Sequence, residues 1–134
     1  MNRTALFPGS FDPFTLGHKI VVDQGLELFE RIVIAVGVNT EKRGLLTPEN
    51  RARLIRDLYR NDSRIEVVIY NELTGKVCRQ LGIDTILRGL RNTVDFEYER
   101  NIMQVNQTLF PEIKTVLLFP PARYVAISSS VIRE

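Results

Sequence analysis

The chain has 134 residues, of which 44% are hydrophobic and 25% are charged, and its formal net charge at pH 7 is +2. This length suits one hydrophobic core and is too short for two, and the weak positive charge gives no reason to expect a nucleic-acid-binding surface. No basic leader precedes the first apolar run and no apolar stretch approaches the ~20 residues of a membrane span, so we expect a cytoplasmic protein without a membrane partner.

Short apolar runs alternate along the chain with longer helical patterns. The runs are nearly continuous and rich in β-branched residues, which is typical of strands covered on both faces of a sheet. The predicted strands are residues 4–7, 32–38, 65–69, 85–87 and 115–119. The predicted helices are residues 17–29, 48–59, 75–81 and 94–110. This alternation predicts an α/β fold with a parallel sheet, right-handed crossovers and a ligand crevice at the carboxyl ends of the strands.

Two of these helices carry local signals. Thr47, Pro48 and Glu49 supply an N-cap, a proline at the first helical position and an acid in the first turn. The only cysteine, Cys78, lies beside Val77 in the next predicted helix. Because it has no second cysteine as partner, we expect a buried thiol rather than a disulfide or a metal cluster.

A dense motif follows the first predicted strand. Residues 8–18 read Pro-Gly-Ser-Phe-Asp-Pro-Phe-Thr-Leu-Gly-His, and His18 is the only histidine. A strand that ends in a Gly-Ser turn and passes through Pro13 into a helix brings backbone N–H groups and the positive helix end to one point, where an anion is stabilised. The imidazole of His18 can donate to a phosphoryl oxygen, with Ser10 opposite. The motif predicts a nucleotide-phosphate site.

Polar segments follow three other predicted strands. Lys42 and Arg43 are adjacent cations after the second strand, and residues 88–91 read Arg-Gly-Leu-Arg after the fourth. Glycine lets a backbone approach a ligand closely, and guanidinium groups bind phosphate oxygens through two parallel hydrogen bonds. The serine triplet at residues 128–130, after the fifth strand, is typical of a helix start that faces an anion. Each segment adds an anion-binding element to the same edge of the predicted sheet.

Together these motifs resemble those of a known enzyme family. Gly-Ser-Phe-Asp-Pro followed by Thr-x-Gly-His is similar to the signature of the nucleotidyltransferase superfamily. Further segments narrow the resemblance to the bacterial phosphopantetheine adenylyltransferases and extend it over nearly the whole chain. They are Lys42, Arg-Gly-Leu-Arg at 88–91, Asp-Phe-Glu-Tyr-Glu at 95–99 and Ile-Ser-Ser-Ser at 127–130. Two positions depart from the family, which often has threonine in place of Ser10 and a larger residue in place of Ala126.

The resemblance implies the fold and the reaction. The fold is a single nucleotidyltransferase domain over residues 1–134, with a Rossmann-like five-stranded parallel sheet, flanking helices and a C-terminal helical tail shorter than in other members. The reaction is transfer of AMP from ATP to 4′-phosphopantetheine, which gives dephospho-coenzyme A and pyrophosphate, with Mg²⁺ as cofactor. A homo-oligomer, namely a hexamer, and coenzyme A as a feedback ligand are further expectations from the family.

The resemblance also implies roles for individual residues, with His18 as the catalytic residue that stabilises the transition state. The expected ATP contacts are Ser10, Phe11, His18, Gly89, Leu90, Arg91, Glu99, Tyr124, Val125, Ala126, Ile127, Ser128, Ser129 and Ser130. The expected contacts to 4′-phosphopantetheine are Ser10, Lys42, Thr74, Arg88, Ile102, Asn106 and Glu134. No side chain is assigned as a metal ligand.

The chemistry of the acceptor agrees with the absence of an obvious general base. A phosphate monoester has a second pKa of about 6, so at neutral pH it is already a dianionic nucleophile. The main barrier is the repulsion between the two anionic substrates. The protein can lower it by positioning the substrates and by stabilising their charge with preorganised cations. Lys42, Arg88, Arg91, His18 and magnesium are expected to share this task.

The longest predicted helix carries two rows of apolar residues at helical spacing. These rows are Phe96, Met103 and Phe110, and Tyr98, Ile102, Val105 and Leu109. We expect most of this surface to be core and part of it to contact another subunit.

Two other functions remain open at this point. One is an adenylyltransferase that acts on nicotinate or nicotinamide mononucleotide, and the other is a nucleotide sensor with an inactive pocket. The presence of His18 and Lys42 argues against the sensor. Pyrophosphate release from ATP and magnesium with each acceptor distinguishes the two enzymes, and binding without turnover would indicate the sensor.

Overall fold

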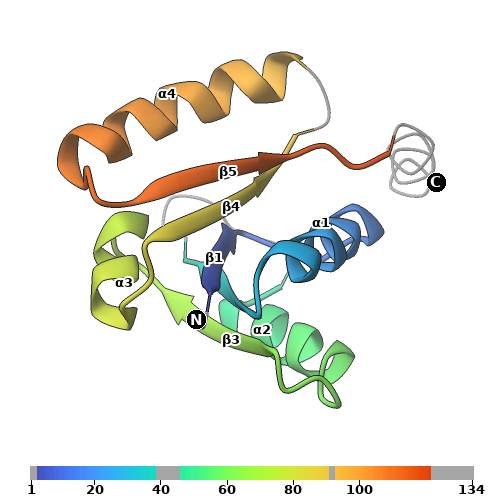
Figure 1. The fold of residues 1–134 in the computed structure, drawn as a ribbon. Helices are drawn as coiled ribbons and strands as arrows, with labels where there is room; N and C mark the ends of the chain where they lie inside the picture. Colours follow the sequence, from blue (N-terminus) through green and yellow to red (C-terminus); the bar gives the residue numbers. More distant parts are fainter. Residues whose placement is uncertain (1–2, 39–45, 91–92, 122–134) are drawn as a thin grey trace.

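The computed structural model describes residues 3–38, 46–90 and 93–121, and only the backbone of residues 93–96, 98 and 99. Within these residues the chain forms five strands with a helix after each of the first four (Figure 1). The strands are β1 (Thr4–Gly9), β2 (Arg31–Gly37), β3 (Ile65–Tyr70), β4 (Thr85–Gly89) and β5 (Lys114–Leu118). The helices are α1 (Leu16–Leu28), α2 (Pro48–Leu58), α3 (Thr74–Leu81) and α4 (Thr93–Leu109). The predicted fold class and alternation of elements are confirmed.

The strands are parallel and lie in the order β3-β2-β1-β4-β5. The chain therefore winds outward from β1 to β3, returns to the centre at β4 and ends the sheet at β5. A reversal of this kind opens a crevice at the carboxyl ends of the two central strands, which here are β1 and β4. The ladder between them consists of the single pair Leu6 and Ile86, whereas β1 and β2 pair from Thr4 to Gly9.

Successive residues of the central strands point to opposite faces of the sheet, and each face has its own core. One face packs against α1 and α2, and its buried residues are Ala5, Phe7, Phe11, Val21, Val22, Ile32, Ile34, Val36, Ala52, Ile55, Val67 and Leu87. The other face packs against α3 and the end of α4, and its buried residues are Leu6, Val33, Ala35, Val77, Cys78, Ile83, Ile86, Phe110 and Ile113.

The helix starts follow from their capping residues. The hydroxyl of Thr47 accepts a hydrogen bond from the backbone N–H of Asn50 at 3.1 Å, and Pro48 occupies the first turn, as predicted. On the opposite face of the sheet, α3 packs closely against Phe110. A Cβ added to Gly75 would come within 2.2 Å of the Phe110 ring, so this close approach requires a glycine. Cys78 is buried in the same layer, which confirms the predicted buried thiol, and burial raises its pKa to about 11.

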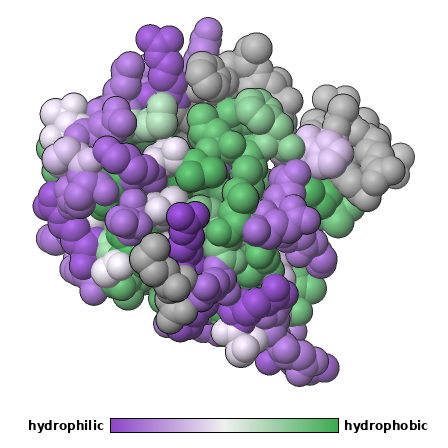
Figure 2. Space-filling view, viewed as in Figure 1, coloured by the Kyte–Doolittle hydropathy of each residue, from purple (hydrophilic) through white to green (hydrophobic). Residues whose placement is uncertain are grey.

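Helix α4 is more exposed than its apolar rows predict. Ile102, Val105 and Leu109 are 38%, 57% and 49% exposed, so these residues of one row lie outside the core of the single chain, whereas Phe110 of the other row is buried. Figure 2 shows further apolar surface between α4 and α1, over β4 and β5. No helix in the described part of the chain is both long and apolar enough to cross a membrane.

Candidate active site

The segment from β1 to α1 bends sharply at the carboxyl end of the sheet. Phe11 has a φ angle of 51°, in the left-handed region that residues with a side chain rarely adopt, and the peptide bond from Asp12 to Pro13 is cis. The Phe11 ring is only 3% exposed and lies against Gly9, where an added Cβ would come within 2.8 Å of the ring. Gly9 is therefore required by this aromatic packing. With the whole residue this deeply buried, Phe11 offers little surface for the predicted contact with ATP.

Thr15 and His18 form a reciprocal cap at the start of α1. The Thr15 hydroxyl accepts from the backbone N–H of His18 at 3.4 Å, and the Thr15 backbone N–H donates to Nδ1 of His18 at 2.9 Å. Because Nδ1 accepts a hydrogen bond from an amide, the proton of the neutral imidazole is on Nε2. The ring is thus the tautomer that can donate from Nε2 to a phosphoryl oxygen.

Aromatic rings surround the imidazole. The centroid of the His18 ring lies 5.0 Å from that of Phe11 and 5.3 Å from that of Phe14, and Phe7 lies further away at 6.3 Å. Ring contacts at these separations and the hydrogen bonds of Thr15 restrict the rotation of His18. The predicted catalytic residue is therefore held in one orientation at the mouth of the crevice.

Strand β4 brings Arg88 to the other side of the crevice. Its guanidinium donates from Nη1 to the backbone carbonyl of Pro8 at 2.7 Å. Gly89 was expected to let the backbone approach a ligand, but the structure gives a different reason for it: an added Cβ would lie 2.5 Å from Cγ2 of Val21, so the glycine allows α1 to pack on β4. Leu90 is 1% exposed and its backbone N–H donates to the carbonyl of Leu118 at 2.8 Å, so the described structure offers little of this residue for the predicted contact with ATP.

Three of the residues expected to contact 4′-phosphopantetheine, Thr74, Ile102 and Asn106, lie on α3 and α4. Thr74 is the first residue of α3, and its hydroxyl is 3.4 Å from that of Tyr70, at the carboxyl end of β3. Ile102 is exposed and Asn106 is half-buried on α4. The remaining predicted contact residues lie outside the described residues, except Glu99, of which only the backbone is described. They are Lys42, Arg91, Glu99, Tyr124, Val125, Ala126, Ile127, Ser128, Ser129, Ser130 and Glu134.

The sequence reading missed one residue beside this site. Arg51, on α2, is 6% exposed and donates three hydrogen bonds to backbone carbonyls, those of Ser10, Gly37 and Leu46. Its position four residues before the buried Ile55 places it on the inward face of α2, which is the signal that could have identified it.

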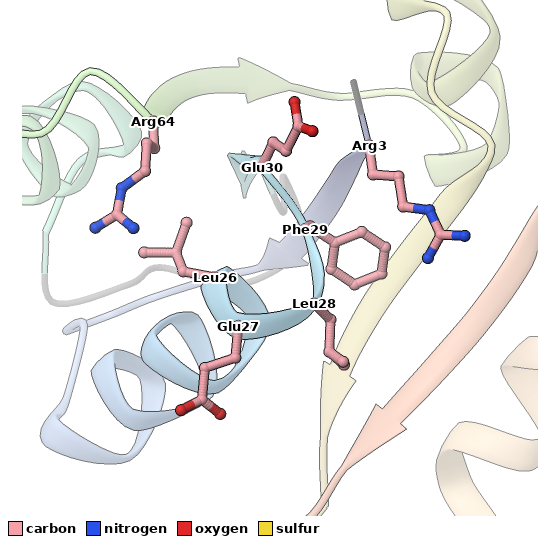
Figure 3. A pocket seen from close by; sticks show the side chains of 7 residues that line it. All are labelled: Arg3, Leu26, Glu27, Leu28, Phe29, Glu30 and Arg64. Atoms are coloured by element: carbon pink, nitrogen blue, oxygen red, sulfur yellow. The ribbon is translucent and has the colours of Figure 1, made fainter. Parts of the chain in front are cut away.

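A second hollow lies at the opposite end of the sheet. A surface cavity of about 370 Å³ lies where α1 ends and β1 and β3 begin, and Figure 3 shows the side chains around it. Its lining residues are Arg3, Leu26, Glu27, Leu28, Phe29, Glu30 and Arg64. The Arg64 guanidinium is already paired with Asp62 through two hydrogen bonds of 2.9 Å. None of the predicted site residues lines this cavity.

The described residues do not form a protein cage for a metal ion. Within residues 3–38, 46–90 and 93–121, no three His, Cys, Asp or Glu side chains gather closely enough to bind one. The carboxylate within the motif, Asp12, uses Oδ1 to accept a hydrogen bond from the backbone N–H of Leu46 at 3.0 Å. Magnesium bound with nucleotides commonly takes its ligands from phosphate oxygens and water, with one or two carboxylates at most.

Comparisons with known proteins agree with this arrangement. A model of the cytidylyltransferase-like family matches residues 6–134. The phosphopantetheine adenylyltransferase of Flavobacterium psychrophilum is 44% identical over 98% of this chain and 87% of its own length, and that of Lactobacillus johnsonii is 45% identical over 97% and 79%. The solved structure of a NadR protein in complex with NAD and AMP-PNP has a TM-score of 0.68 over 99% of this chain and 42% of its own, at 16% identity, a likeness of fold alone. With its predicted motifs, its fold and these relatives in agreement, the chain belongs to the phosphopantetheine adenylyltransferase family.

Proposed function

We propose that this protein transfers AMP from ATP to 4′-phosphopantetheine and releases dephospho-coenzyme A and pyrophosphate, a step of coenzyme A biosynthesis. The observation that carries the proposal is the 44% identity to a phosphopantetheine adenylyltransferase over 98% of the chain. The capped imidazole of His18 beside the β1–β4 crevice gives that activity a physical basis.

The proposed reaction is a displacement at the α-phosphorus of ATP. An oxygen of the acceptor phosphate forms a new bond to this phosphorus, and the bond from the phosphorus to the bridging oxygen of the β-phosphate breaks. The electron pair leaves with pyrophosphate. Since the acceptor phosphate is ionised near neutral pH, no residue has to remove a proton from it.

Under this proposal, the protein positions the two anions and stabilises the charge that develops between them. His18 donates from Nε2 to an α-phosphoryl oxygen, because Thr15 occupies Nδ1. Arg88 and Lys42 bind the acceptor phosphate, and Arg91 binds ATP. Magnesium bound with ATP would neutralise part of the negative charge of its phosphates.

The acceptor phosphate has two parts in this mechanism, as anchor and as nucleophile. Pantetheine without the phosphate offers a hydroxyl, which would need a base within hydrogen-bond reach. Asp12 already accepts a hydrogen bond from Leu46, and His18 is assigned to the phosphoryl oxygens. We therefore expect adenylylation of 4′-phosphopantetheine and none of pantetheine at matched concentrations. Comparable adenylylation of the two, followed by mass spectrometry, would contradict the mechanism.

A further inference from the structure

Arg51 is a buried cation that is held by backbone carbonyls rather than by a carboxylate. It is 6% exposed, and none of the described residues forms an ion pair with it. Burial of an arginine is costly unless its N–H groups find acceptors. At Arg51 the acceptors all belong to segments at the carboxyl edge of the sheet, so this cost is offset by contacts that join those segments.

The three acceptors come from different parts of the chain. Nη1 of Arg51 donates to the carbonyl of Ser10 at 2.7 Å and to that of Gly37 at 3.4 Å, while Nε donates to the carbonyl of Leu46 at 3.1 Å. Ser10 follows β1, Gly37 ends β2, and Leu46 precedes the N-cap of α2. A planar guanidinium fixes the relative positions of acceptors that bind to its different nitrogens.

A fourth hydrogen bond closes the network. The backbone N–H of Leu46 donates to Oδ1 of Asp12 at 3.0 Å, and Asp12 is two residues from Ser10. The turn after β1 is therefore joined to Leu46 twice, once through Arg51 and once through Asp12. In the sequence, Gly37 and Leu46 flank the segment that contains Lys42, so both ends of that segment are tied to the same turn.

We propose that Arg51 is a positioning residue that holds the β1–α1 turn in register with the end of β2 at Gly37 and with Leu46 before α2. The inference rests on the proposed function, in which Ser10 and His18 meet the ATP phosphates and Lys42 meets the acceptor phosphate. Arg51 touches neither substrate in this role. It fixes the position of the turn that carries Ser10 and leads to His18.

The test compares Arg51→Lys with wild type. Lysine keeps the buried charge but cannot place donors at both the Nε and Nη1 positions, so the register is lost while the charge is retained. We expect kcat to fall about tenfold or more, because small misplacements of reacting groups have large effects on rate. The KM for 4′-phosphopantetheine should rise about fivefold, while ATP affinity by calorimetry changes by less than about threefold.

Arg56→Lys is the matched control. Arg56 lies on the same helix and its Nη2 also donates to a backbone carbonyl, that of Val67 at 2.9 Å, but it is exposed and away from the turn. Its kinetic constants should stay within about twofold of wild type, as is usual for surface substitutions. Circular dichroism and thermal unfolding of each variant report the folded fraction.

The readouts separate positioning from folding. A variant that only loses folded protein has a lower kcat and an unchanged KM for the acceptor, and this result in Arg51→Lys would overturn the proposal. Arg51→Gln, which keeps an amide donor, is the second variant. If neither variant folds, the role of Arg51 is purely structural and the positioning proposal is overturned. Wild-type protein without turnover would overturn the proposed function and this role with it, whereas an active wild type with an unaffected Arg51→Lys would overturn this role alone.

Discussion

At the scale of single residues, the central feature is how backbone geometry prepares His18. An imidazole alone could donate from either nitrogen, but the amide of Thr15 occupies Nδ1 and leaves the proton on Nε2. The rings of Phe11 and Phe14 restrict its rotation. The motif therefore supplies the imidazole and also determines which nitrogen donates.

Replacement of His18 separates chemistry from capping. We expect His18→Ala to lower kcat by about 10²–10³, the usual effect of losing one preorganised donor to a developing oxyanion, with a much smaller loss of ATP affinity. His18→Gln is the control, because glutamine at this helical position can accept the Thr15 N–H and preserve the cap. Steady-state kinetics and thermal unfolding measure the two effects, and full activity in His18→Ala would exclude the catalytic role.

Cys78 gives a prediction of pH dependence. Burial raises its pKa from 9.0 to about 11, so the folded state favours the neutral thiol. This preference stabilises the fold fully below pH 9 and is lost as the pH rises toward about 11. At pH 8 a thiol reagent should modify Cys78 slowly in the native protein and rapidly in urea. Equal rates in the two conditions would show that the thiol is accessible.

At the scale of elements, the approach of α1 to β4 depends on Gly89. An added Cβ would lie 2.5 Å from Cγ2 of Val21, so we expect Gly89→Ala to destabilise the protein by about 1–3 kcal/mol, as overpacking usually does. The double variant with Val21→Ala removes the clashing methyl group and should be more stable than the sum of the single changes predicts. Urea denaturation measures this coupling, and strict additivity would argue against packing as the reason for the glycine.

The sequence predicted the elements better than their contacts. The sequence predicts a first strand that ends at Phe7. The structure continues β1 to Gly9. Pro8 is tolerated in this central strand because the β1–β4 ladder contains only the pair Leu6 and Ile86, and because the Arg88 guanidinium binds the Pro8 carbonyl. That contact joins residues 80 positions apart, and no local pattern predicts it.

The sequence predicted only those features of the candidate site that depend on residues close together in the chain. Local motifs placed His18 at the start of a helix after the first strand, because capping residues and apolar runs are local signals. The buried state of Arg51, the packing reason for Gly89 and the burial of the Phe11 ring depend on neighbours distant in the sequence.

At the scale of the whole molecule, the exposed apolar row of α4 supports self-association. Ile102, Val105 and Leu109 are all more than one-third exposed in the single chain. We propose that this row lies between copies of the chain, with the hexamer of the resembling family as the expected assembly. Val105→Asp should then lower the mass measured by analytical ultracentrifugation, while Gln107→Asp on the same helix should not. Wild-type protein at the mass of one chain would contradict this assembly.

The choice of acceptor tests the central claim most directly. Purified protein with ATP and magnesium is given either 4′-phosphopantetheine or nicotinamide mononucleotide, and pyrophosphate release is followed. We predict release with 4′-phosphopantetheine, with dephospho-coenzyme A as the product by mass, and no release above background with the mononucleotide. Release with the mononucleotide alone, or ATP binding without release in either case, would contradict the proposed function.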